Sequence, residues 1–300
     1  MSDGTMAYPK VANLGSLGTE RVFMGPVTIQ EKVDGSQFRI GTDGEGGFHV
    51  ASHHQKLYEG NVAGMFQLPF EYAQDVIRPK LCEAWPENCW LFCEVVSKCK
   101  QNAITYDRPA KNGLVLFDVF SSGVFMVSKH VQMLAQKLCI DSVPTYHEGE
   151  STKDEALAFL GRESFLGGAL AEGIVIKNYA ETRMVGPHVW PVFTKFVRPE
   201  FRELNSKEHP AQKDKLAELF GQFCTEARWQ KAIQHLREQG QIQDAVQDIG
   251  PLIKEITRDI WEEEGEAIAQ LLLAHFRKDI TRTATRGFPE WYKAQLLERI

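Results

Sequence analysis

The sequence lacks the features that would place it in a membrane, among secreted proteins or among strongly basic ones. No stretch approaches the roughly 18 consecutive apolar residues of a membrane-spanning helix. No basic segment followed by an apolar run stands near the first residue, so we expect no secretory signal. Lys and Arg number 34 against 40 Asp and Glu, a net charge of -6, which excludes a generally basic protein but not a local basic groove.

The sequence lacks the cysteine spacing that is typical of zinc sites. None of the six cysteines pairs with another at C-x-x-C spacing. Cys93 falls inside an apolar run, where a buried thiol is ordinary. We therefore expect reduced thiols in a cytoplasmic protein and no structural zinc site.

Up to about residue 200, the sequence has short apolar and β-branched runs separated by Gly, Asp and Asn, which predict strands. Helical patterns begin at Ser128 and at Thr152, where Thr152 and Glu155 fit a capping box. This mixture predicts an α+β domain of antiparallel sheets with flanking helices, not a doubly wound array. The expected strands are residues 27–29, 37–40, 47–51, 90–96, 114–120, 123–127, 173–177 and 192–197.

After residue 205 the strand pattern stops and apolar residues recur at helical spacing, punctuated by glycines. We therefore expect two domains, residues 1–205 and a small all-α domain over residues 206–300. The polar stretch 202–213 is the expected linker.

The first chemical signal is a Lys-x-Asp-Gly motif, Lys32 to Gly35, between two expected strands. Alone it is weak, because Asp-Gly is a common hairpin turn and Lys32 would then be solvated. Further charged residues follow in or beside apolar strands: Glu94, Asp118, Glu172 with Gly173, Lys177 and Lys195. Because Lys and Glu are rarely buried without a partner, this set suits a site that holds a metal and a nucleotide phosphate.

The ordered set resembles the covalent nucleotidyltransferases, which are the polynucleotide ligases and mRNA capping enzymes, over about residues 20–200. DNA ligases and capping enzymes continue with an OB-fold barrel, whereas residues 206–300 read as helices here. That layout is similar to the RNA ligase 2 family known from bacteriophage, in which an ATP-grasp-like ligase domain precedes a helical domain. Weak similarity continues through residues 244–263 and toward Trp291.

The resemblance implies an ATP-dependent polynucleotide (RNA) ligase. Such an enzyme joins 5′-phosphate and 3′-hydroxyl ends of RNA, or of RNA and DNA, through a lysyl-AMP on Lys32 and an adenylylated 5′ end. It also implies a monomer in the cytoplasm of a bacterium or a phage-infected cell. Two alternatives stay open: a capping-type guanylyltransferase, which would use GTP, and a catalytically inactive nucleic-acid-binding relative.

The same resemblance implies roles for single residues. Lys32 is the nucleophile, and its pKa has to be lowered by burial or by the positive charge of Lys177, Lys195 and a metal. Phe117 corresponds to the aromatic ring that stacks on adenine, with an ordinary core residue as the alternative. The expected ligands of Mg²⁺ or Mn²⁺ are Asp34, Glu94 and Glu172, and Glu94 also contacts the ribose. The expected catalytic and nucleotide-contacting residues together are Glu31, Lys32, Asp34, Gly35, Glu94, Phe117, Glu172, Lys177 and Lys195.

The last motif departs from the family pattern. Relatives carry two lysines one residue apart, where this chain has Lys195, Val197 and then Arg198. Either Arg198 replaces the second lysine or the site works with one.

A second departure follows the nucleophile, where relatives carry an arginine and this chain has His53, His54 and Lys56. These residues are candidates for the missing phosphate or ribose contact, with a plain surface position as the alternative. On a strand, His53 and His54 would point to opposite faces and would not share an ion. In the helical part, the candidate nucleic-acid contacts are Arg277, Lys278, Arg282 and Arg286, with a solvated helix face as the alternative.

Overall fold

The computed structural model describes most of the 300 residues. The described ranges are residues 5–16, 18–43, 45–62, 64–84, 88–101, 103–185, 188–198, 220–221 and 223–297. Residue contacts divide the chain into two compact units, Met1–Leu252 and Ile253–Ile300. The boundary expected near residue 205 and the expected linker lie outside the described residues, so the division 1–205 and 206–300 stays a prediction.

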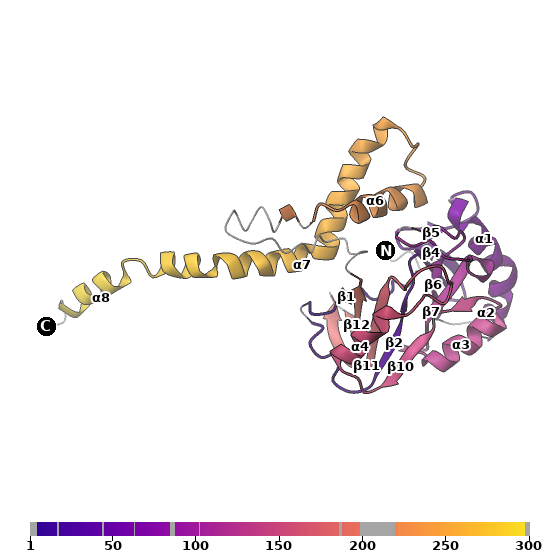
Figure 1. The fold of residues 1–300 in the computed structure, drawn as a ribbon, viewed down its shortest axis with the longest axis horizontal. Coiled ribbons are helices and arrows are strands. Elements are labelled where there is room, and N and C mark those ends of the chain that lie inside the picture. Colours follow the sequence, from indigo (N-terminus) through magenta and orange to yellow (C-terminus); the bar gives the residue numbers. More distant parts are fainter. Residues whose placement is uncertain are drawn as a thin grey trace. The chain divides into compact units, whose positions relative to one another are not determined.

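The first unit contains two β-sheets (Figure 1). One sheet has five strands in the order β1-β12-β11-β2-β10, and all its neighbours are antiparallel except the β1–β12 pair. We refer to it as sheet A. Its strands are β1 (Ala12–Asn13), β12 (His188–Val197), β11 (Gly173–Val185), β2 (Val27–Lys32) and β10 (Thr145–Gly149).

The second sheet, sheet B, has seven strands in the order β5-β4-β3-β6-β7-β8, with β9 parallel to β7. The other pairs are antiparallel. Its strands are β5 (Lys56–Leu57), β4 (Phe48–Ser52), β3 (Ser36–Thr42), β6 (Cys89–Val95), β7 (Leu114–Ser121), β8 (Val124–Phe125) and β9 (Asp141–Ser142).

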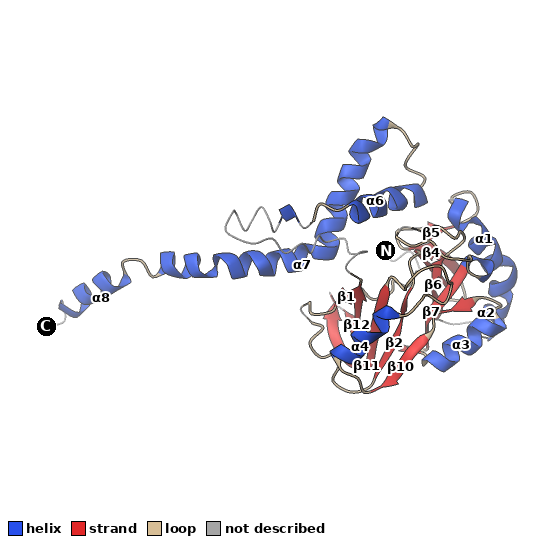
Figure 2. Cartoon of the chain, viewed as in Figure 1, coloured by secondary structure: helices blue, strands red, loops and turns tan. Residues whose placement is uncertain are grey.

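Helices cover one face of sheet B (Figure 2). The main apolar core lies there, where Phe38, Leu91 and Leu116 pack with Phe66, Ile77 and Leu134. The alternation of side chains along each strand leaves the opposite face of the sheet for the site. The helices of this part are α1 (Gly64–Tyr72), η1 (Ala73–Ile77), α2 (Arg78–Ala84), η2 (Lys111–Gly113) and α3 (Ser128–Lys137).

A smaller core lies on one face of sheet A, where Ile29, Ile174 and Val192 pack with Ala156. Ala156 belongs to α4 (Lys153–Ala158), which is followed by η3 (Phe159–Gly161). The predicted capping box is confirmed: Glu155 N donates to Thr152 Oγ1 at 3.3 Å, and Thr152 N donates to Glu155 Oε2 at 2.8 Å.

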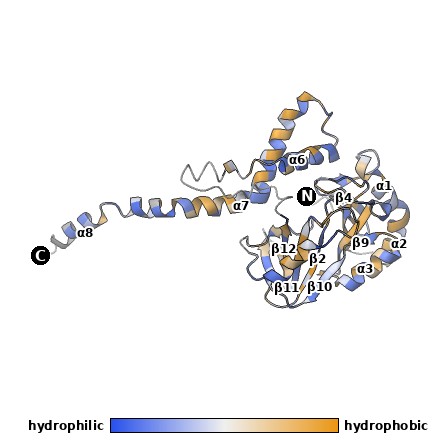
Figure 3. Cartoon of the chain, in the orientation of Figure 1, coloured by the Kyte–Doolittle hydropathy of each residue, from blue (hydrophilic) through white to orange (hydrophobic). Residues whose placement is uncertain are grey.

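The described residues beyond 220 contain helices and no strand, as the sequence predicts. They form α6 (Glu226–Glu238), η5 (Val246–Asp248), α7 (Ile249–Ala284) and α8 (Phe288–Leu297). Apolar and polar residues alternate along α7 (Figure 3), and Arg258 pairs with Glu255 and Glu262 on it. Arg277, Lys278, Arg282 and Arg286 are exposed, and their role as nucleic-acid contacts stays a prediction.

The mixed α+β architecture with antiparallel sheets is confirmed. No helix in the described ranges combines the length and the apolar character that spanning a bilayer requires.

Candidate active site

Lys32 ends β2 at the point where the chain passes from one sheet to the other. The hairpin alternative for Asp34-Gly35 is wrong, because β2 pairs with β10 and β11, whereas the following strand, β3, pairs with β4 and β6. Lys32 lies opposite Gly173 of β11, so Glu172 is its neighbour across the sheet. Lys32 Nζ donates to Glu172 Oε2 at 2.6 Å.

Acidic groups surround the Lys32 ammonium. Burial alone would lower the pKa of Lys32, but the carboxylates of Glu172, Glu94 and Asp34 outweigh burial and raise that pKa above its usual value. The expectation that positive charge lowers this pKa is therefore not met in the protein without ligands. Lys32 is protonated here and forms an ion pair with Glu172.

Glu94 reaches the same site from sheet B. It lies opposite Gln37 in the β3–β6 pairing, and its Oε2 is buried without a hydrogen-bond partner among the described residues. Burial raises the pKa of Glu94 to about 8; Lys32 opposes the shift, and Glu172, Asp34 and Glu238 add to it. A Cβ on Gly35 would lie 2.8 Å from Val95 O and 3.2 Å from Glu94 Cβ, so the motif glycine permits this close approach.

We expect the stability of the metal-free protein to fall between about pH 5 and pH 8. The folded protein keeps a proton on Glu94 up to a pKa of about 8, whereas the unfolded chain releases it near 4.5. The stabilising contribution of that proton is complete below the unfolded pKa and is lost as the pH rises toward 8. Glu94→Gln should therefore lie within about 1 kcal/mol of the wild type at pH 5 and exceed its free energy of unfolding by roughly 3–4 kcal/mol at pH 8.

Urea unfolding in the presence of a chelator measures this difference at both pH values. Glu163→Gln is the matched control, because Glu163 is exposed and its substitution should leave stability unchanged at either pH. Equal effects of Glu94→Gln at pH 5 and pH 8 would contradict the prediction.

Asp34 fixes a loop beside the nucleophile. Its Oδ2 accepts hydrogen bonds from Ala103 N at 2.7 Å and Ile104 N at 2.9 Å, and its own backbone N donates to the Tyr106 hydroxyl at 2.8 Å. Burial raises the pKa of Asp34 to about 6, Glu172 adds to the shift, and the two amides and Lys32 oppose it. Among the described residues, Asp34, Glu94 and Glu172 do not form a group whose carboxylate oxygens all lie within 4.8 Å of one another.

Glu31 does not share a face with Lys32. Because strand side chains alternate, its carboxylate lies on the opposite side of β2, where it accepts from Ser164 Oγ at 2.5 Å, the Tyr146 hydroxyl at 2.9 Å and Phe165 N at 3.1 Å. The side chain of Glu31 thus holds the segment before β11, and its expected contact with a nucleotide stays a prediction.

Lys177 forms a buried ion pair with Asp118. Its Nζ lies 2.9 Å from Asp118 Oδ2 and donates to the Phe117 carbonyl at 2.8 Å. Burial lowers the pKa of Lys177 and raises the pKa of Asp118, and the ion pair opposes both shifts. The Tyr8 hydroxyl also donates to Asp118, at 2.8 Å. Lys177 therefore fixes the backbone of Phe117 through this hydrogen bond, and the expected role of Lys177 at a phosphate stays a prediction.

Phe117 lies at an irregularity of sheet B, where the β6–β7 register shifts, and it is half-buried. Its ring meets Tyr8 edge-on, with centroids 5.0 Å apart.

Lys195 lies opposite Val175, which also faces Gln30, so Lys195 shares with Lys32 the face of sheet A that carries the site. Arg198, just past β12, donates its backbone N to Glu172 O at 2.9 Å.

The two histidines lie after β4, which ends at Ser52. The expectation that strand geometry separates them is therefore wrong, and their ring centroids lie 4.6 Å apart. His53 Nδ1 is 3.2 Å from Gln37 Oε1, on the residue opposite Glu94. Of the three candidates for the missing arginine, the structure thus brings His53 to the side of sheet B that carries Glu94.

Several residues of the site carry no signal in the sequence. Within the first unit, α6 brings Glu238 to Ser36, directly after the Lys-x-Asp-Gly motif; the Ser36 hydroxyl donates to Glu238, and Gln234 Nε2 donates to both, at 2.5 Å and 2.7 Å. Tyr8 and Tyr106 carry no such signal either. Tyr8 bonds to Asp118 and Tyr106 to Asp34, and each partner lies more than 70 residues away along the chain, a distance that no local pattern bridges.

The fold and the site define the class of protein: a two-sheet α+β domain with a lysine at the junction of the sheets and carboxylates around it. The family model described as RNA ligase matches residues 25–191, more than half of the chain, and the chain belongs to the RNA ligase family. The matched range contains Lys32, Glu94 and Glu172 and ends before Lys195.

Solved structures that resemble the chain include several of Naegleria gruberi RNA ligase. A variant without ligand has 15% sequence identity and a TM-score of 0.46, covering 63% of this chain and 56% of that one. A variant with ATP and Mn has the same identity and TM-score, with coverages of 65% and 57%. The complex with PPi has 15% identity, a TM-score of 0.43 and coverages of 65% and 60%. The chain thus spans little more than half the length of these structures. Comparison with curated proteins found no match.

Proposed function

We propose that the chain is an ATP-dependent RNA ligase that joins 5′-phosphate to 3′-hydroxyl ends. The observation that carries this proposal is the position of Lys32, 2.6 Å from Glu172 and close enough to Glu94 and Asp34 for both to raise its pKa. The finer assignment rests on the sequence resemblance alone. By that resemblance, the chain is a member of the RNA ligase 2 family of bacteriophage and a monomer in a bacterial or phage-infected cytoplasm.

The proposed reaction has three transfers. Lys32 Nζ attacks the α-phosphorus of ATP, a P–N bond forms and the bond to pyrophosphate breaks. The 5′-phosphate of an RNA strand then takes the AMP from Lys32, and a 3′-hydroxyl attacks the activated phosphate and releases AMP. Before the first transfer the Lys32 ammonium has to lose a proton, and Glu172 Oε2 lies within hydrogen-bond distance to accept it.

The acidic residues fit a divalent cation, because the buried Glu94 Oε2 has no hydrogen-bond partner among the described residues. Mg²⁺ keeps several waters and needs only a few carboxylates. We assign Mg²⁺ or Mn²⁺ to Glu94 and Glu172; Asp34 has one oxygen committed to backbone amides. When bound, the cation neutralises the carboxylates that keep Lys32 protonated and offsets the charge of the triphosphate.

Gln30 supports ATP over the GTP of a capping-type enzyme. It is buried on the face of β2 that carries Lys32, and its Oε1 has no hydrogen-bond partner among the described residues, whereas its Nε2 lies 3.4 Å from Thr145 Oγ1. An amide oxygen can accept from the amino group of adenine, but it would face the carbonyl of guanine. Gln30→Leu is therefore expected to raise the KM for ATP roughly tenfold and to weaken the preference over GTP.

Rates of lysyl-AMP formation over a range of ATP and GTP concentrations measure both effects. Gln132→Leu is the matched control, since Gln132 reaches the same Thr145 hydroxyl, at 3.5 Å, from α3. Unchanged KM and unchanged nucleotide preference in Gln30→Leu would show that Gln30 does not contact the base of the nucleotide.

Sealing of a nicked RNA duplex tests the proposed function. With ATP and Mg²⁺, joining is expected when the nick carries a 5′-phosphate and a 3′-hydroxyl, and no joining is expected with 5′-hydroxyl and 3′-phosphate ends. Covalent labelling by GTP without sealing would favour the guanylyltransferase. Binding of RNA without labelling by either nucleotide would favour an inactive relative.

A further inference from the structure

The segment between β6 and β7 is rich in positive charge on a chain that is acidic overall. Residues 97–111 contain four cations, Lys98, Lys100, Arg108 and Lys111, and one acid, Asp107, whereas the whole chain has a net charge of -6. Local positive charge on an acidic protein creates a confined attractive potential for polyanions.

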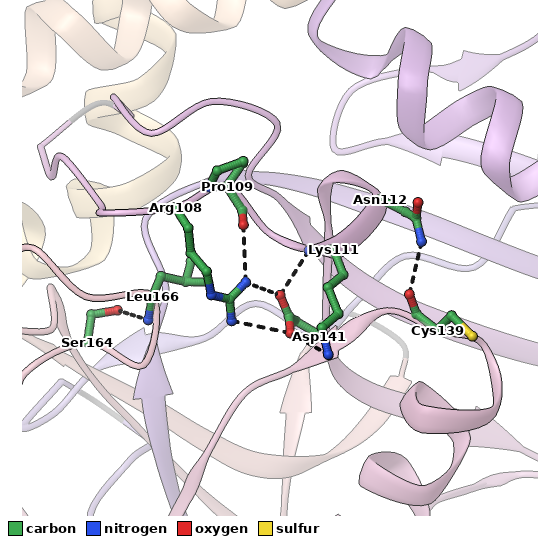
Figure 4. Close-up of polar contacts among 8 residues, drawn as sticks. All are labelled: Arg108, Pro109, Lys111, Asn112, Cys139, Asp141, Ser164 and Leu166. Atoms are coloured by element: carbon green, nitrogen blue, oxygen red, sulfur yellow. Dashed lines mark hydrogen bonds and ion pairs between the residues drawn. The ribbon is translucent and has the colours of Figure 1, made fainter.

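Arg108 and Lys111 are engaged with a neighbouring acid (Figure 4). Arg108 Nη1 lies 2.6 Å from Asp141 Oδ2, and Lys111 Nζ lies 4.0 Å from Asp141 Oδ1. Lys111 N also donates to Asp141 Oδ2, at 2.9 Å. Asp141 therefore offsets one of these two charges, and the segment keeps a surplus of positive charge that includes Lys98 and Lys100.

These two lysines belong to a small hairpin with one arm at residues 97–101 and the other at residues 103–107, which we call the basic hairpin. Lys100 pairs with Thr105, Tyr106 N donates to Cys99 O at 2.9 Å, and Gln101 N donates to Ile104 O at 2.8 Å. Lys98 and Lys100 are exposed, and neither forms an ion pair within the ranges that the structure describes. Their charges are thus available to a partner in solution.

The basic hairpin is attached directly to the nucleotidyl-transfer motif. The amides of Ala103 and Ile104 bind the carboxylate of Asp34, and the Tyr106 hydroxyl binds the Asp34 backbone. Ile104 and Tyr106 are buried and anchor the hairpin from beneath. Because Asp34 is two residues from Lys32, these contacts fix the hairpin that carries the two lysines beside the Lys32 motif.

We infer that the basic hairpin binds the phosphodiester backbone of the nucleic acid next to the break, an inference that rests on the proposed function. Two exposed, strongly hydrated ammonium groups suit the contact with successive phosphates that holds a strand without reading its sequence. The triphosphate of ATP is the weaker candidate. The triphosphate has to reach Lys32 Nζ, which lies inside the site beside Glu172. A second cation, Lys195, is already present on the same face of sheet A as Lys32.

The experiment compares the wild type with the double variant Lys98→Ala/Lys100→Ala. The probe is a fluorescent nicked RNA duplex that lacks the 3′-hydroxyl at the nick, so that it cannot be sealed, and its affinity is measured over a series of NaCl concentrations without ATP. The slope of log K against log salt should become less steep by roughly 1.5, since each lost phosphate contact removes about 0.7–0.9. Affinity at low salt should fall about tenfold, whereas lysyl-AMP formation, which needs no nucleic acid, should keep its rate.

Lys129→Ala/Lys137→Ala is the matched control, because it removes the same charge from exposed positions of α3, the helix that covers the opposite face of sheet B. This control should keep the wild-type slope. An unchanged slope in the hairpin variant overturns the inference, as does an equal change in the control. A raised KM for ATP with an unchanged slope would assign the hairpin to the triphosphate instead. Failure of the proposed function would be recorded separately, as the absence of lysyl-AMP in the wild type.

Discussion

Glu172→Gln is expected to slow the formation of lysyl-AMP by roughly a thousandfold, within the range for loss of a positioned proton acceptor. The Glu172 carboxylate lies 2.6 Å from Lys32 Nζ and, of the three carboxylates around this ammonium, contributes most to keeping it protonated. The amide keeps the size of the side chain and can still accept a hydrogen bond, but it accepts no proton and binds a divalent cation poorly. The protein should remain folded, so that the loss is confined to chemistry.

Single-turnover labelling with ATP measures this rate. Glu172→Asp keeps the charge on a shorter side chain and should lose less activity than Glu172→Gln. Glu163 is exposed and lies in the segment that precedes β11. The control Glu163→Gln should therefore label at the wild-type rate. Labelling of Glu172→Gln within tenfold of the wild type would show that Glu172 is not the proton acceptor.

Lys177→Met is expected to lower the free energy of unfolding by about 3–5 kcal/mol, the usual effect of removing one partner of a buried ion pair. Lys177 is 1% exposed and Asp118 0% exposed, so the substitution leaves the Asp118 carboxylate in the interior without its cation. The hydroxyls of Tyr8 and Tyr179 remain as donors at 2.8 Å and 3.4 Å, but they supply no charge.

A second variant separates the ion pair from the packing around it. Lys177→Met/Asp118→Leu removes both charges and should recover most of the lost stability, because apolar residues of similar volume often replace a buried pair without cost. Urea denaturation measures both variants, with Tyr179→Phe as a control that should cost at most about 1 kcal/mol. A loss below about 1 kcal/mol for Lys177→Met would mean that the lysine is not held in this pair.

The strands that could be predicted are those whose apolar alternation is strong. Each of the eight expected strands overlaps an observed one, namely β2, β3, β4, β6, β7, β8, β11 and β12, although β8 is only Val124–Phe125. The other four strands of the described residues carry little apolar pattern: β10, for example, reads Thr-Tyr-His-Glu-Gly and is held by pairing with β2. Propensity is a weak guide where tertiary pairing supplies the stabilisation.

The candidate site was only partly accessible from sequence because the pairing of charges is a tertiary property. Asp118 and Lys177 both stand out in the sequence as charged residues inside apolar strands that require partners, and only the fold shows that they are partners of each other. Strand alternation alone would have placed Glu31 on the face opposite Lys32. By contrast, Glu238 reaches Ser36 from 202 residues further along the chain, so only the folded structure reveals it.

The central claim is that Lys32 is the residue that carries AMP. The direct measurement is mass spectrometry of peptides from the protein after incubation with ATP and Mg²⁺, with Lys32→Ala treated in parallel. A single peptide, the one containing Lys32, is expected to gain the mass of one AMP, and Lys32→Ala is expected to gain none. AMP on Lys177 or Lys195, or an equal yield of adduct in Lys32→Ala, would contradict it.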